Sequence, residues 1–94
     1  MVKVTWSLFA KADLDEIEAY IAIDSPYYAR RTVEKILKRV EVLHSFPQIG
    51  RMVPEFDKEN IRELIEGNYR IIYFNISENE IVITRVHHAA RLLK

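Results

Sequence analysis

A chain of 94 residues is long enough for one hydrophobic core and too short for two, so we expect a single domain spanning residues 1–94. Its 14 basic and 14 acidic residues balance, which excludes a general electrostatic attraction to nucleic acid. The absence of cysteine excludes a disulfide scaffold, a thiol nucleophile and a cysteine-ligated zinc site.

The sequence carries no sign of membrane insertion or export. No apolar run approaches the roughly 20 residues that span a bilayer. The N-terminal stretch MVKVTWSLF lacks the apolar core of a signal peptide. We therefore predict a cytoplasmic protein with no membrane partner.

The N-terminal half predicts one short strand and two helices. VKVTW, residues 2–6, alternates β-branched and polar residues and is typical of a strand. Ser7 is a plausible N-cap for an amphipathic helix over residues 8–23, whose acidic residues fall mostly on the solvent side: Asp13, Asp15, Glu16 and Glu18. Ser25 and Pro26 indicate the start of a second helix, which we expect to end near residue 44.

These two helices should form an antiparallel hairpin, because only Asp24 and Ser25 separate them. In the second helix, Glu34 and Lys38 have the i,i+4 spacing that supports an exposed helix surface.

The C-terminal half predicts a loop and three strands. FPQIGRMVPEF, residues 46–56, contains two of the three prolines and indicates a loop. IRELIE (61–66), YRIIYFNI (69–76) and EIVITRVH (80–87) are typical of strands, and Gly67 with Asn68 can form a tight turn between the first two. AARLLK, residues 89–94, can form a last short helix.

The predicted order is therefore β-α-α-β-β-β, which is an α+β fold. We expect a twisted antiparallel sheet with the helical hairpin packed on one face.

Strict alternation along the strands assigns side chains to faces. One face of strand 69–76 carries Arg70, Ile72, Phe74 and Ile76. In strand 80–88, alternation places Ile81, Ile83, Arg85 and His87 together, and on the other face Val82, Thr84, Val86 and His88. Arg70 lies in an apolar run, so it must either pair with Glu63 or Glu66 across the hairpin or face a ligand.

Basic and imidazole groups concentrate in the C-terminal quarter of the chain, so a local basic face is possible on a neutral protein. They are Arg70, Arg85, His87, His88 and Arg91. Two adjacent histidines of a strand point to opposite faces, and no histidine pair has ligand spacing. We therefore predict no metal site.

Placed on this order of elements, nearly the whole chain resembles the RelE/ParE superfamily of toxins from type II toxin–antitoxin modules. The resemblance rests on five stretches, of which residues 46–50 of the connecting loop, YRIIY and VHHAAR are the most specific. They are LFAKADLDEIEAYIA, SPYYARRTVEKI, FPQIGRMVPEF, IRELIEGNYRIIYFNI and IVITRVHHAAR.

The resemblance implies a helical hairpin on one sheet face and a working surface on the other. It also implies one of two activities: RelE-like members cleave mRNA at the ribosomal A site, whereas ParE-like members block DNA gyrase without cleaving anything. Fold alone does not choose between these activities. Neither implies a cofactor.

Some residues match the nuclease branch. Arg70 falls at the arginine of a YR-x-x-Y strand that RelE-like nucleases place near the scissile phosphate, and Arg91 falls near a second basic residue. His87 or His88 resembles the general acid or base of the YoeB-like branch. As a ribonuclease, the protein would therefore use Arg70, His87, His88 and Arg91.

Other residues depart from that branch. RelE has two lysines in the strand that matches IRELIE, where this chain has only Arg62, and a C-terminal tyrosine, whereas the last tyrosine here is Tyr73. The ending Val86, His88 and Arg91 resembles ParE-type members.

We therefore expect a ParE-like toxin that binds DNA gyrase and is neutralised in a hetero-oligomer by a cognate antitoxin. An acidic antitoxin segment would fold across the apolar and basic sheet face. The alternatives are a ribosome-dependent mRNA endonuclease and a non-toxic interaction domain. The residues expected to bind the target or antitoxin are Arg62, Arg70, Arg85, His88 and Arg91. The resemblance favours a ligand over a structural pair for Arg70.

Overall fold

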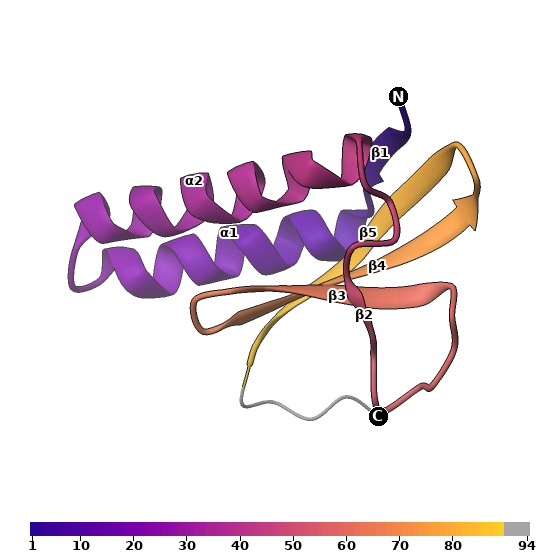
Figure 1. The fold of residues 1–94 in the computed structure, drawn as a ribbon. Coiled ribbons are helices and arrows are strands. Elements are labelled where there is room, and N and C mark those ends of the chain that lie inside the picture. Colours follow the sequence, from indigo (N-terminus) through magenta and orange to yellow (C-terminus); the bar gives the residue numbers. More distant parts are fainter. Residues whose placement is uncertain (90–94) are drawn as a thin grey trace.

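The computed structural model describes residues 1–89 as two helices on one side of a five-stranded sheet (Figure 1). The elements are β1 (Lys3–Trp6), α1 (Leu8–Ala22), α2 (Pro26–Glu41), a 3-10 turn η1 (Val42–His44), β2 (Arg51–Met52), β3 (Ile61–Glu66), β4 (Tyr69–Ser77) and β5 (Glu80–His88). The predicted α+β order is confirmed, and β2 is an addition within the predicted loop. The short helix predicted over 89–94, which contains Arg91, lies beyond the described residues except for Ala89.

The helix starts follow the predicted capping chemistry. The Ser7 hydroxyl accepts a hydrogen bond from the Ala10 N–H at 3.0 Å, and the Ser25 hydroxyl accepts one from the Tyr28 N–H at 3.2 Å. Each bond satisfies one of the N–H groups that a helix leaves without an intrahelical partner. Pro26 occupies the start of α2, where a missing N–H costs nothing. Because the connection between Ala22 and Pro26 is short, the two helices run antiparallel, one above the other, as Figure 1 shows.

The sheet is mixed rather than wholly antiparallel. Its strand order is β1-β5-β4-β3-β2, and β1 runs parallel to β5 whereas all other neighbours are antiparallel. The helical hairpin carries the chain from β1 to β2 at the opposite edge of the sheet, and β3, β4 and β5 then return it to lie beside β1. The tight turn at Gly67 is confirmed, since Gly67 has a φ of 57°, a left-handed conformation that glycine adopts without steric cost.

Two β-bulges break the predicted alternation in the β4–β5 pair. Tyr73 pairs with Ile83 while Ile72 pairs with Arg85, which leaves Thr84 as an extra residue in β5. A second register shift between Asn75 and Ser77 inserts an extra residue in β4. The prediction that Ile83 and Arg85 share a face is therefore wrong, because an extra residue reverses the side-chain direction.

The bulge at Thr84 places the apolar and the polar side chains of β5 on opposite faces of the sheet. The apolar Ile81, Ile83 and Val86 all enter the core beneath the helices. Arg85 and His87 lie opposite Ile72 and Arg70 on the other face. The core also contains side chains from both helices, from the 3-10 turn and from β3 and β4: Ala10, Ile36, Val40, Leu43, Leu64, Ile71 and Tyr73.

The loop between α2 and β3 is anchored at Gly50. The Gly50 N–H donates to the Tyr73 hydroxyl at 2.9 Å, and the Gly50 carbonyl accepts from Arg62 Nη1 at 2.8 Å. A Cβ atom at Gly50 would lie 2.6 Å from the Glu63 carbonyl oxygen and 2.7 Å from the Tyr73 ring, so the close approach requires glycine. This contact links the two most specific sequence stretches, the FPQIG loop and the YRIIY strand.

Within residues 1–89, no helix combines the length and the apolar content needed to cross a bilayer.

Candidate functional site

The sheet face opposite the helices carries the candidate residues of β4 and β5. Arg70 pairs with His87, and Ile72 pairs with Arg85, across the two strands. On the neighbouring strand β3, Glu63 lies opposite Ile72. We call this surface the open sheet face, meaning the side of β3–β5 that carries Glu63, Arg70, Ile72, Phe74, Arg85 and His87.

Arg70 is the centre of a buried ion cluster. Arg70 is only 5% exposed, and its Nε donates to Glu63 Oε1 at 2.7 Å. Its Nη1 and Nη2 donate to the two carboxylate oxygens of Glu55 at 2.7 and 2.8 Å. The second oxygen of Glu63 accepts from Arg51 Nε at 2.6 Å. The bidentate pairing of Arg70 with Glu55 is of the kind that ranks among the strongest that arginine forms.

Two carboxylates therefore neutralise the guanidinium of Arg70. The hydrogen bonds that Arg70 donates, chiefly to Glu55 and then to Glu63, outweigh the cost of burial and raise the pKa of Arg70 above its ordinary value. Of the two sequence alternatives, the geometry favours the structural pair with Glu63. The sequence did not reveal Glu55, a loop residue that folds over the strand.

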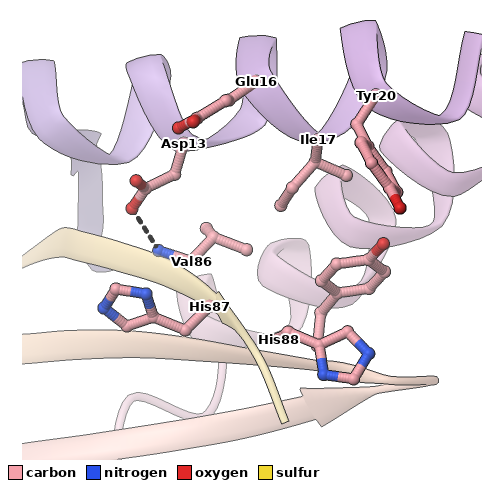
Figure 2. A pocket seen from close by; sticks show the side chains of 8 residues that line it. Asp13, Glu16, Ile17, Tyr20, Val86, His87 and His88 are labelled. Atoms are coloured by element: carbon pink, nitrogen blue, oxygen red, sulfur yellow. Dashed lines mark hydrogen bonds between the residues drawn. The ribbon is translucent and has the colours of Figure 1, made fainter. Parts of the chain in front are cut away.

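Arg85 has a different partner and a different exposure. Its Nε and Nη2 donate to the carboxylate of Asp13 on α1 at 2.8 and 3.1 Å, although the Arg85 side chain remains 44% exposed. The same carboxylate accepts the Val86 N–H at 2.8 Å, the bond drawn in Figure 2. Because β1 ends at Trp6, the Val86 N–H has no neighbouring strand on that side of β5, and the Asp13 carboxylate accepts its hydrogen bond instead.

Asp13 is buried, whereas the helical pattern indicated that the acidic residues of α1 lie mostly in solvent. Burial alone would raise the pKa of Asp13, but the hydrogen bonds from Arg85 and from the Val86 N–H, with the positive charge of Arg85, hold the pKa below 3.8. Asp13 is thus an ionised clip between α1 and β5.

A pocket of about 340 Å³ opens beside this clip, between α1 and the end of β5 (Figure 2). Carboxylate, phenol and imidazole groups surround it: its lining is Asp13, Glu16, Ile17, Tyr20, Tyr69, Val86, His87 and His88. His87 is buried, whereas His88 is exposed and packs edge-on against Tyr69 with ring centroids 5.8 Å apart. Both predicted catalytic histidines therefore reach one pocket.

A second pocket, of about 250 Å³, lies on the open sheet face. Its walls are mainly apolar: Phe56, Ile61, Ile72, Phe74, Thr84, Arg85 and His87. Arg70 does not line either of these pockets. Its accessible side belongs to a separate, more open hollow with Arg51, Glu55 and Ala89. The structure thus separates Arg70 from the cavity that contains His88.

The remaining predicted residues have other settings. Arg62 is half-buried and holds the Gly50 carbonyl, so part of its guanidinium is engaged in fixing the loop. Arg91 lies outside the described residues. Among residues 1–89, no group of three or more histidine, aspartate or glutamate side chains has the arrangement of a metal site.

Comparison with known proteins agrees with this architecture. A family model described as the ParE toxin of the type II toxin–antitoxin system parDE matches residues 4–93. Toxin RelE2 of Caulobacter vibrioides is 32% identical over 92 residues, which are 98% of this chain and 100% of that protein. Putative toxin Y4kP of Sinorhizobium fredii is 37% identical over 86 residues, which are 90% of this chain and 86% of that protein.

A solved structure titled "Chromosomal ParDE TA system from P. aeruginosa" superimposes with a TM-score of 0.75 at 26% identity, covering 94% of this chain and 96% of that one. Sequence and fold therefore agree over nearly the whole length. The chain belongs to the ParE toxin family of type II toxin–antitoxin systems, within the RelE/ParE superfamily.

Proposed function

We propose that this toxin arrests growth by binding DNA gyrase without cutting nucleic acid, and that a cognate antitoxin neutralises it in the cytoplasm. The observation that carries the proposal is the neutralised state of Arg70. A cleavage site of the nuclease type needs cations free to stabilise the charge that develops on the phosphate. Here Glu55 and Glu63 occupy the guanidinium at 2.7–2.8 Å.

The second cation of the open sheet face is also engaged. Asp13 binds the guanidinium of Arg85 through two hydrogen bonds. A phosphate would have to displace a carboxylate from each arginine, against electrostatic attraction in a partly buried setting. Non-catalytic binding requires no such displacement.

Ribosome-dependent mRNA cleavage is the second candidate, and one observation favours it. His87 and His88 both line the pocket beside α1, and imidazole is the side chain that most often acts as a general acid or base. In this alternative the histidines would supply the proton transfers, and Arg91 would have to supply the free cation.

The proposed antitoxin contact is the apolar pocket of the open sheet face. Phe74 is 36% exposed and Phe56 is 38% exposed at its rim, and the half-exposed Arg85 lies beside them in its ion pair with Asp13. A segment with an apolar anchor matches the exposed aromatic rings. His88 lines the other pocket, beside α1, and Arg62 lies opposite the core residue Tyr73, so neither residue belongs to this surface.

The activity is tested with purified toxin in two parallel assays. We expect inhibition of gyrase supercoiling of a relaxed plasmid, and no cleavage by primer extension on mRNA held in translating ribosomes. Cuts at the A site without gyrase inhibition would overturn the proposal in favour of the nuclease. A His87→Ala, His88→Ala variant is the matched control, because only the nuclease alternative requires these side chains for activity.

The module is tested in cells. Expression of the chain alone should stop growth, and co-expression of the protein encoded by the adjacent gene should restore it. Full expression of folded toxin without a growth defect would overturn both active functions and leave a non-toxic interaction domain.

A further inference from the structure

Positive charge without a carboxylate partner lies on α2 rather than on the open sheet face. Four basic residues follow one side of this helix: Arg31, Lys35, Lys38 and Arg39. At 100° per residue they fall within an arc of about 100°, and Val42 continues the same line. We call these four residues the α2 stripe. Arg31, Lys35 and Lys38 are exposed, and Arg39 is half-buried.

The ion pairs of the described chain avoid the α2 stripe. Carboxylates pair with Arg51, Arg70 and Arg85, all of them in or beside the sheet. Within residues 1–89, none of the ion pairs includes a basic residue of α2, and the sequence-predicted contact between Glu34 and Lys38 is not formed. Within the described part of the chain, the stripe therefore keeps its charge free of carboxylate partners.

The stripe also borders a concave surface. Lys35, Lys38, Arg39 and Val42 line a hollow of about 240 Å³ together with Glu66 of β3, and Arg39 Nε donates to the Ile65 carbonyl at 3.4 Å. Three cations thus face one carboxylate around this hollow. Glu34 lies about 60° around the helix from Arg31, on the side away from Arg39. Glu34 and Glu66 together do not cancel the four positive charges of the stripe.

We propose that the α2 stripe binds the phosphate backbone of duplex DNA. This inference rests on the proposed gyrase target, because gyrase holds duplex DNA. From Arg31 to Arg39 the stripe extends about 12 Å along the helix, and B-DNA carries a phosphate about every 3.4 Å per strand. The stripe can therefore contact several phosphates. Val42 is the only apolar member of the hollow, so an acidic peptide would find no apolar anchor there.

The charge balance of the whole chain makes this attraction local. Equal numbers of acidic and basic residues give no long-range steering, so binding must depend on charges within about 10 Å of the DNA. We expect weak, sequence-independent binding in the micromolar range or above, with strong salt dependence.

Fluorescence anisotropy with a short labelled DNA duplex tests the proposal without gyrase. If four phosphates are neutralised, raising salt from about 50 mM to about 200 mM should lower wild-type affinity by roughly 100-fold. Lys35→Glu with Lys38→Glu should weaken binding at least tenfold at low salt and reduce the remaining salt effect to about tenfold.

The matched control is Lys11→Glu with Lys58→Glu, which changes net charge equally at two exposed positions outside α2. It should retain the wild-type salt dependence, and circular dichroism should show both variants folded. Equal loss in the two variants would overturn the proposal, since bulk charge would then explain it. Tighter binding of single-stranded RNA than of duplex would also overturn it, as would loss of antitoxin binding by the stripe variant without any loss of DNA binding.

The proposed function fails separately from this inference. A wild-type toxin that binds duplex through the α2 stripe but does not inhibit gyrase would contradict the target and support the DNA surface. A wild-type toxin that inhibits gyrase but binds duplex no better than the stripe variant would support the target and contradict the DNA surface.

Discussion

Arg70 and the α2 stripe place positive charge in opposite surroundings. Arg70 is 5% exposed and held by Glu55 and Glu63, whereas Lys35 and Lys38 are exposed and have no ion pair within the described part of the chain. A buried cation without a partner would cost several kcal/mol, so its partners become part of the fold. An exposed cation stays hydrated and costs the fold almost nothing. The arginines of the open sheet face are therefore held in ion pairs within the fold, whereas the charge of the α2 stripe is exposed and open to a binding partner.

The largest expected effect is that of Arg70→Ala. The substitution removes the buried partner of Glu63, whose side chain is 0% exposed and keeps only the exposed Arg51, and it removes the bidentate partner of Glu55. We expect a loss of about 3–5 kcal/mol in the free energy of unfolding, measured by urea denaturation. Arg51→Ala is the matched control, because Arg51 pairs with the same Glu63 while its own side chain is 63% exposed. That variant should lose about 1 kcal/mol or less. Equal small losses in both would show that Arg70 has no structural role.

Gly50→Ala should cause the next largest loss in the free energy of unfolding. The added methyl group would meet the Glu63 carbonyl at 2.6 Å and Tyr73 at 2.7 Å, so backbone or core must shift. We expect a loss of about 1–3 kcal/mol in thermal or urea unfolding. Gly67→Ala is the comparison: nothing lies within 4 Å, but the φ of 57° disfavours alanine by about 1 kcal/mol. A larger loss at Gly67 than at Gly50 would contradict the packing argument for the FPQIG loop.

Asp13→Ala should cost about 1–3 kcal/mol, because it leaves the Val86 N–H without its acceptor and Arg85 without its partner. The effect should depend on pH. The pKa of Asp13 is lower in the folded protein than in the unfolded chain, so ionisation stabilises the fold above about pH 4. This contribution disappears as pH falls through the lower, folded-state pKa. Urea denaturation of wild type and variant should therefore converge under strongly acidic conditions, and a constant difference would contradict the ionised clip.

The smallest effect on stability should come from Lys35→Ala with Lys38→Ala. Exposed side chains without an ion pair usually change the free energy of unfolding by about 0.5 kcal/mol or less. A loss similar to that of Arg70→Ala would show that the stripe belongs to the fold and would remove the contrast between the two regions.

The sequence predicted the local features well because they depend on neighbouring residues. The caps at Ser7 and Ser25 and the turn at Gly67 follow from short-range chemistry, and the structure confirms them. The alternative of an Arg70–Glu63 pair was also accessible, because the two residues belong to one hairpin.

Three features could not be derived from residue patterns. The bulge at Thr84 reverses the strand alternation without a glycine to signal it. Glu55 reaches Arg70 from a loop 15 positions away, and Asp13 reaches Arg85 from 72 positions away. Such contacts depend on how the elements pack, so the C-terminal quarter looked like a basic surface although its described arginines are neutralised in space.

Gyrase supercoiling measured across a titration of toxin tests this division of charge most directly. We expect wild type and the Lys11→Glu, Lys58→Glu control to inhibit equally, whereas the folded Lys35→Glu, Lys38→Glu variant should need at least tenfold more protein because it has lost about two phosphate contacts. Inhibition by the folded stripe variant at the same concentrations as wild type would contradict it.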